Sequence, residues 1–176
     1  MADDGWRLRA VTTDDIDGLN ALAVIPQVYR YLFDGRPPDR TFIADRVAQS
    51  IANATTPGLG MWVLRRTDGQ PAGLVELRPY PAPRSAELTY LLDPSHWGQG
   101  LAVRMAWTVV SEAFRLGQID TIVAGADIPN TRSFGVMRRL GMRLHKDVSY
   151  PLGPGVEFAL HRDEAGATPK PPPFGI

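Results

Sequence analysis

The sequence predicts a mixed α/β (α+β) fold with a crossover helix over one face of its sheet. Three observations support this prediction. Runs typical of strands follow one another before residue 93, a strongly apolar helical stretch covers residues 101–116, and strand and helix patterns then alternate. The length of 176 residues suits one domain with one core, and we expect that domain to span residues 1–163.

The N-terminal part is expected to contain one strand and two helices. In residues 6–11 apolar side chains alternate with arginines, which indicates a strand. Residues 12–15 supply N-cap side chains for a helix that Pro26 ends, and its apolar side is formed by Ile16, Leu19, Leu22 and Ala23. A second helix is predicted over residues 39–54, whereas the aromatic stretch 29–33 is ambiguous.

A three-stranded meander follows. Two strands, at residues 61–66 and 72–78, flank the Asp68-Gly69 pair, which is a hairpin signal. A proline-rich loop then leads into a third strand at residues 86–92.

The C-terminal half alternates helices and strands. The helix over residues 101–116 is apolar nearly all round, so we expect it to be buried against the sheet. Residues 121–126 form a continuous apolar run that suits an inner strand, and residues 130–140 form a helix that Gly141 ends. Two final strands are predicted at residues 142–145 and 156–161, and the proline-rich segment 164–176 is expected to be a flexible tail.

Composition excludes several classes of function. The chain has 19 basic and 19 acidic residues, so no basic surplus indicates a nucleic-acid partner. It has no cysteine, which excludes disulfides, thiolate metal sites and a cysteine nucleophile, and we expect no metal. The N-terminus lacks the pattern of a signal peptide, and no apolar stretch is long enough to span a bilayer. We therefore expect a cytoplasmic protein without a membrane partner.

The strongest local motif is Trp97-Gly98-Gln99-Gly100-Leu101-Ala102, a turn between a strand and a helix. Its glycines let the backbone turn tightly and approach a ligand. The first N–H groups of a helix have no partner within it, and the helix dipole there favours an anion. The motif therefore predicts a phosphate or pyrophosphate site, although glycines at such a turn often serve only to make the turn.

Two blocks of sequence carry a family resemblance. The first runs from Glu87 to Ala102 and contains this turn, and the second is Asn130-Thr131-Arg132-Ser133 followed by Met137-Arg138-Arg139-Leu140-Gly141-Met142. Together they resemble the acetyl-CoA-binding motifs of the GNAT N-acetyltransferases, more narrowly the branch of ribosomal-protein N-terminal acetyltransferases. The resemblance implies the GNAT fold, a mixed central sheet of about six to seven strands with helices on both faces.

The resemblance also implies how acetyl-CoA would bind. Backbone groups of Tyr90, Leu91 and Leu92 would pair with the pantetheine arm, and the pyrophosphate would be surrounded by Gly98, Gln99, Gly100, Leu101, Ala102 and Val103. Asn130 would hydrogen-bond the pantetheine, and Ser133 would lie near the sulfur. Met137 stands where many family members have a tyrosine, so Ser133 or a water would protonate the departing thiolate. Without the resemblance, Asn130 and Ser133 are equally typical of a helix-capping pair.

The implied reaction is attack of a neutral amine on the thioester. The N–H of Leu92 or of its neighbour would stabilise the oxyanion, and Glu87 is the first candidate for the general base, ahead of Glu76 and His96. Each of these side chains would also be ordinary as a solvated surface group.

The acceptor is expected to be an amine-bearing small molecule or a peptide N-terminus. Aromatic side chains that could line its pocket are Tyr29, Tyr31, Phe33, Trp62 and Tyr80. A homodimer is a reasonable expectation for a small enzyme. The alternative function is a non-catalytic acetyl-CoA-binding sensor or partner module with the same fold.

Overall fold

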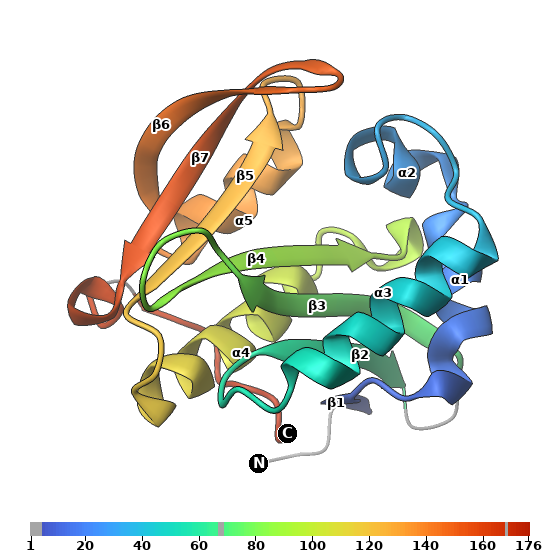
Figure 1. Cartoon of the computed structure of the whole chain (residues 1–176), viewed down its shortest axis with the longest axis horizontal. Coiled ribbons are helices and arrows are strands. Elements are labelled where there is room, and N and C mark those ends of the chain that lie inside the picture. The colour runs from blue at the N-terminus through green and yellow to red at the C-terminus, as the bar shows by residue number, and fades with distance from the viewer. Residues whose placement is uncertain (1–4, 67–68, 168) are drawn as a thin grey trace.

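The computed structural model describes residues 5–66, 69–167 and 169–176, which contain one seven-stranded sheet (Figure 1). The strand order is β1-β2-β3-β4-β5-β7-β6. Neighbouring strands are antiparallel except for β4 and β5, which are parallel. The strands are β1 (Trp6–Ala10), β2 (Gly60–Arg66), β3 (Pro71–Pro79), β4 (Ser85–Leu92), β5 (Thr121–Asp127), β6 (Arg143–Tyr150) and β7 (Gly153–His161). The sheet is therefore mixed, as predicted.

Helices cover both faces of this sheet (Figure 1). On one face, α1 (Ile16–Ala23) and α3 (Arg40–Asn53) pack on β2 and β3, and α2 (Pro26–Leu32) follows α1. On the other face, α4 (Leu101–Leu116) packs on β3 and β4, and α5 (Thr131–Arg139) lies beside β5. Each face has its own hydrophobic cluster, and the larger one is centred on α4. Across the described residues, no helix is both long and apolar enough to cross a membrane.

The apolar helix α4 is buried against the sheet, as its sequence predicts. Met105, Ala106 and Val109 are at most 1% exposed. Glycines in the left-handed conformation stand at both ends of the helix, Gly100 with φ 76° and Gly117 with φ 76°. Because L side chains rarely adopt this conformation, glycine at these two positions fixes where the helix starts and ends.

The parallel strands β4 and β5 pair over a short stretch and then diverge. Their register joins Ser85–Glu87 to Thr121–Val123 and continues no further, although β4 runs on to Leu92 and β5 to Asp127. From Leu88 onward, the edge of β4 that faces β5 therefore has no strand partner. This opening positions the candidate site.

Three elements differ from the prediction in kind or in length. The ambiguous stretch 29–33 mostly belongs to α2, which Pro26 starts as its first residue because the missing N–H costs nothing there. The last two strands are longer than predicted, since β6 is an edge strand with mostly exposed side chains and lacks an alternating pattern. The antiparallel pairing of β2 and β3 agrees with the predicted hairpin, although Asp68 of its turn lies outside the described residues.

The C-terminal segment docks on α4, which differs from the flexible tail we expected. The side chain of Phe174 is only 5% exposed, and its backbone N–H donates to Thr108 Oγ1 at 2.9 Å. The guanidinium of Arg104 lies 3.8 Å from the centroid of the Phe174 ring. The proline-rich composition suggests a free chain, but one aromatic anchor is enough to hold its end against the helix.

Candidate active site

A cavity of about 920 Å³ opens where β4 and β5 diverge. Its walls come from both strands, the N-terminus of α4, α5 and, on the opposite face, α2 and α3. It includes all but one of the residues predicted to bind the cofactor, the exception being Gln99, whose side chain is exposed. The glycine turn and the Asn130–Ser133 motif therefore line the same cavity, although they are about 30 residues apart in sequence.

The glycine turn forms a cradle at the start of α4. Gly98 has φ 79° and Gly100 has φ 76°, and a Cβ added at either residue would have no atom within 4 Å. The turn therefore leaves room for a ligand to approach the backbone, beside helical N–H groups that have no partner in the helix. The guanidinium of Arg132 stacks 4.6 Å from the centroid of Trp97 and adds positive charge beside the turn. These features fit the pyrophosphate of a coenzyme A molecule.

The backbone N–H and C=O groups of β4 point alternately toward β3 and toward the open edge. Asp93 N–H donates to the Ala72 carbonyl of the neighbouring strand β3 at 2.8 Å. Because antiparallel partners alternate, Leu92 and Tyr90 direct their N–H and C=O groups away from β3. The Leu91 carbonyl instead lies against Gly73 of β3, only 2.8 Å from where a Cβ of that glycine would stand.

These directions decide which backbone groups are open to the predicted pantetheine contacts. The backbone of Leu91 faces β3, so it is not available at the open edge, and its side chain packs in the cluster beneath α1 and α3. The carbonyl of Leu92 accepts a hydrogen bond from Trp97 Nε1 at 2.9 Å. Tyr90 thus offers both backbone groups at this edge, whereas Leu92 offers its N–H.

Ser133 has a partner that the sequence did not predict. Its Oγ lies 2.7 Å from the hydroxyl of Tyr90, which also lies 3.1 Å from the Ser133 carbonyl oxygen. Burial raises the pKa of the Tyr90 hydroxyl, so this group stays protonated at neutral pH. Asn130 Oδ1 accepts from the Ser133 N–H at 3.3 Å, so Asn130 does cap α5. Both residues line the cavity, so capping and ligand binding are compatible.

The predicted bases occupy different environments. Glu87 is half-buried in the cavity wall, and its Oε2 accepts from Arg78 Nε at 2.8 Å and from Nη2 at 2.7 Å. Glu76 is 3% exposed and bonded by Arg46 Nη2 at 2.5 Å, and burial raises its pKa against the opposing charge of Arg46. His96 lines the cavity near the glycine turn. All three side chains line the cavity, and of the two carboxylates Glu87 is the more accessible, with 32% of its side chain exposed against 4% for Glu76.

The cavity residues that the sequence reasoning missed include Tyr150 and Asp127. The Tyr150 ring passes over Gly155 of β7, and the Tyr150 hydroxyl lies over Gly125 of β5. A Cβ added at Gly125 would be only 1.8 Å from this hydroxyl, so a larger residue would not fit there. Burial, followed by the charges of Glu157 and other carboxylates, raises the pKa of Tyr150 to about 12. A glycine inside the apolar run of β5 was the available sequence signal, since such a glycine often marks a close approach.

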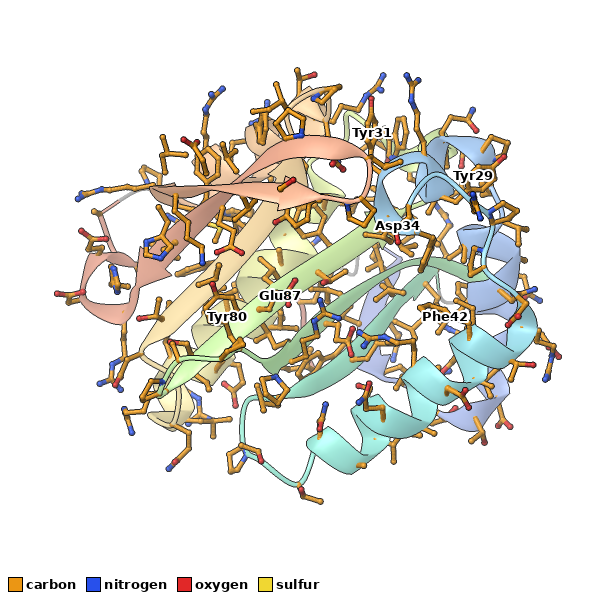
Figure 2. All side chains as sticks on the ribbon, turned by 45° about the horizontal axis from the view of Figure 1, so that its top comes forward. Tyr29, Tyr31, Asp34, Phe42, Tyr80 and Glu87 are labelled. Atoms are coloured by element: carbon orange, nitrogen blue, oxygen red, sulfur yellow. The ribbon has the colours of Figure 1, made fainter. Side chains whose placement is uncertain are left out.

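The α2 region bridges the cavity on the side away from α4. The hydroxyl of Tyr31 lies 3.5 Å from the Pro129 carbonyl oxygen, and a Cβ added at Gly35 would lie 3.4 Å from Leu152 Cδ2 in the β6–β7 turn. Figure 2 shows Asp34 in this bridging loop and Glu87 on β4 below it. Of the predicted acceptor aromatics, Tyr31 and Phe33 line the cavity, whereas the remaining ones, Tyr29, Trp62 and Tyr80, do not.

Charged side chains elsewhere near the cavity are mostly paired. Glu157 accepts from the hydroxyl of Tyr80 at 2.8 Å and lies 3.2 Å from Lys146 Nζ.

Within residues 5–66, 69–167 and 169–176, no group of three or more histidine, aspartate or glutamate side chains is placed to hold a metal ion.

Comparison with known proteins agrees with this geometry. The family described as "Acetyltransferase (GNAT) domain" matches residues 6–143. RimL, a ribosomal L7/L12 alpha-N-protein acetyltransferase solved with coenzyme A, is similar in fold with a TM-score of 0.77. It is 19% identical, and the match covers 90% of this chain and 94% of that chain.

Two further solved structures share the fold. The spermidine N-acetyltransferase of Vibrio cholerae, in complex with CoA and spermine, has a TM-score of 0.75 at 16% identity, over 92% of this chain and 98% of that chain. The aminoglycoside acetyltransferase AAC(6')-Ib, in complex with coenzyme A, has a TM-score of 0.72 at 17% identity, over 90% and 95% of the two chains. The seven-stranded mixed sheet is thus the fold that the resemblance implied.

Proposed function

Because the chain belongs to the GNAT acetyltransferase family, we propose that it transfers the acetyl group of acetyl-CoA to a primary amine. The amine attacks the thioester directly and belongs to a small molecule or to the N-terminus of a protein. The observation that supports this most strongly is the cavity itself, in which a glycine cradle, an unpaired strand edge and a hydroxyl pair lie along one path. Acetyl-CoA supplies the activated acyl group when it is bound.

The chain's own groups would bind the cosubstrate along this path. The turn at Gly98 and Gly100 would receive the pyrophosphate through backbone N–H groups, with Arg132 as a nearby cation. Tyr90 would pair with the pantetheine through its backbone, as an added strand does. The N–H of Leu92 or of Tyr90 would donate to the carbonyl oxygen of the acetyl group, where negative charge develops during attack.

The two proton transfers would take place on opposite faces of β4, one at Ser133 of α5 and the other at Glu87 of β4. Ser133 Oγ would protonate the departing thiolate, and the Tyr90 hydroxyl at 2.7 Å would hold Ser133 in place. On the other face, Glu87 would take one proton from the incoming ammonium, directly or through a water, before the neutral amine attacks. The second proton, which the nitrogen loses as the amide forms, would return to Ser133. The guanidinium of Arg78 binds Glu87 Oε2 and so fixes the orientation of the carboxylate.

The three solved neighbours act on a protein N-terminus, an aminoglycoside and spermidine. The bridge between α2 and the β5–α5 region encloses the acceptor side of the cavity. We therefore propose that the acceptor enters as a narrow group, either a small molecule or the end of a peptide.

A calorimetric titration with acetyl-CoA tests the cofactor site. Wild type is expected to bind, and Gly100→Trp is expected not to bind because its side chain would stand in the open space above the turn. Gly100→Ala is the matched control, since it introduces the same left-handed strain without the bulk. Gly166→Trp, at an exposed glycine outside the cavity lining, controls for the added indole.

Release of free CoA with an amine panel then tests the reaction. The panel contains an N-terminal peptide, a polyamine, an aminoglycoside and an amino acid, each with wild type and with Glu87→Gln. Binding without acetylation of any amine would contradict the proposed enzyme and favour a non-catalytic acetyl-CoA-binding module. Failure of the wild type to bind acetyl-CoA would overturn the cofactor site as well.

A further inference from the structure

Three acidic side chains are buried among the described residues, Asp15, Glu76 and Asp127. Two of them are neutralised by arginines. Asp15 is bound by Arg9 at 2.7 Å and by Arg65 at 2.6 Å, and Glu76 is bound by Arg46. This is the usual arrangement, because a buried carboxylate without a cation costs several kcal/mol of folding free energy.

Asp127 has no such neutralisation. It is 7% exposed, and its Oδ1 is fully buried with no hydrogen-bond partner among the described residues. Burial raises the pKa of Asp127 against the hydrogen bond of its own backbone, and the negative charge of Asp34 raises that pKa further. No ion pair is recorded for Asp34 within the described part of the chain, and both carboxylates line the cavity.

The position of Asp127 separates it from Glu87. Val123 is the β5 partner of Glu87, and Asp127 lies four residues further along the strand, about 13 Å at 3.3 Å per residue. Asp127 is the last residue of β5, at the end that diverges from β4. Its side chain is on the same face of the strand as Gly125 and the Tyr150 hydroxyl. A cation bound at Asp127 would therefore stand apart from an amine that Glu87 deprotonates.

Asp34 reaches the same part of the cavity from the opposite wall. It lies in the loop after α2 (Figure 2), next to Gly35, where an added Cβ would lie 3.4 Å from Leu152 Cδ2 of the β6–β7 turn. In α2 itself, the Tyr31 hydroxyl lies 3.5 Å from the Pro129 carbonyl oxygen. Asp34 has φ 52°, a conformation that asparagine also tolerates. The two carboxylates thus approach each other from α2 and β5, with the aromatic side chains of Tyr31 and Phe33 also in the lining.

We propose that Asp127 and Asp34 form a cation-binding subsite for the acceptor, which carries a positively charged group besides the amine that is acetylated. The inference rests on the proposed function, since it assigns the acceptor class of the same site. The Asp127 carboxylate, which lines the cavity, accepts a hydrogen bond from this second cationic group, and Asp34 adds a charge that is closer to solvent. The ligand supplies the positive charge that the protein supplies to Asp15 and Glu76.

The test uses α,ω-diamines from diaminopropane to diaminohexane, each beside the n-alkylamine of the same chain length. Binding is measured by calorimetry on the full chain saturated with CoA, and acetylation is measured by CoA release with acetyl-CoA. The variants are Asp127→Asn and Asp34→Asn, which keep side-chain shape, and Asp45→Asn, an exposed carboxylate outside the cavity lining, is the control. The thermal midpoint of each variant confirms that it is folded.

We expect at least one diamine to bind wild type about tenfold or more tightly than its monoamine, as a charged hydrogen bond allows. Asp127→Asn removes this preference, Asp34→Asn weakens it, and Asp45→Asn leaves it unchanged. The proposal is overturned if diamines and monoamines bind alike, or if Asp127→Asn weakens both equally. Binding does not require turnover, so the two proposals can fail separately. Tighter binding of diamines without acetylation would contradict only the proposed enzyme. Acetylation without tighter binding of diamines would contradict only the cation-binding subsite.

Discussion

Replacing Ser133 by alanine tests the acid side of the proposed reaction. The variant deletes one oxygen, the Oγ that lies 2.7 Å from the Tyr90 hydroxyl, while Tyr90 keeps its 3.1 Å contact with the Ser133 carbonyl. The N-cap bond from Asn130 uses the backbone N–H of residue 133 and is also retained. The free energy of unfolding should therefore fall by about 1 kcal/mol, as for the loss of one neutral hydrogen bond.

The effect on turnover should be larger than the effect on stability. General acid catalysis contributes about 10²- to 10⁴-fold, and a thiol with a pKa near 8.5 needs less help to leave than an alkoxide does. We expect Ser133→Ala to lower kcat about 100-fold, with little change in the KM for acetyl-CoA. Tyr90→Phe should lower kcat about tenfold, because it acts through Ser133, and the double variant should resemble Ser133→Ala alone.

The assay is release of free CoA measured with a thiol reagent, which has no background from the protein because the chain contains no cysteine. Ser133→Thr, which retains a hydroxyl, should recover part of the lost kcat. An unchanged kcat in Ser133→Ala would refute the assignment of the acid. A change confined to the KM for acetyl-CoA would show that Ser133 only binds the cosubstrate.

Three further predictions concern stability, measured by urea unfolding. Asp15→Asn should cost about 3 kcal/mol at pH 7, because it leaves two arginines without their carboxylate. Although burial raises the pKa of Asp15, bonds from Arg9 and the backbone of residue 12 and the charges of both arginines outweigh it, and the net pKa is lowered. The wild-type advantage should therefore shrink as pH falls below about 4. Arg46→Met should cost about 3 kcal/mol at pH 7 by leaving Glu76 buried and unpaired. Because burial raises the pKa of Glu76, this cost should grow as pH rises from about 4 and be absent below it. Phe174→Ala should cost about 2 kcal/mol, since the anchor of the C-terminal segment is buried.

Each stability prediction has a control on the same chain. Asp17→Asn removes a carboxylate from an exposed pair with Arg40 and should have little effect. Ile176→Ala shortens a terminal side chain that is 56% exposed, so it should leave stability unchanged where Phe174→Ala does not. If Arg46→Met is equally destabilised at every pH, lost packing of the arginine stem rather than the Glu76 charge explains the effect.

The features predicted correctly from the sequence depend on local signals. The helix α4 was predicted from its continuous apolar pattern, and the turn before it from Gly98 and Gly100. Asn130 and Ser133 belong to one short motif, and the helix cap that this motif indicates is present in α5. These signals need no knowledge of which strands pair.

The features that were missed depend on pairing across the sheet. The hydroxyl pair joins Tyr90 of β4 to Ser133 of α5, which are 43 residues apart, and no spacing rule connects them. Asp127 ends an apolar strand, where an aspartate is ordinary, and its lack of a cation is visible only once its neighbours are placed. The free edge of β4 exists because β5 pairs with it over three residues and then diverges, a tertiary property that a strand pattern does not encode.

The alternation of β4 separates the two proton transfers. Ala86, Leu88 and Leu92 face the cluster around α4, and Tyr90 follows the same alternation to reach Ser133 on α5. Glu87 and Leu91 face the other side, where Arg78 and the α1–α3 layer lie. The base Glu87 and the tyrosine that holds the acid Ser133 therefore lie on opposite faces of one strand, three residues apart, and a slip of one residue in the β3–β4 register would move each of them to the other face. This explains why the strand is held on one edge by β3 along its full length while its other edge is left open to the ligand.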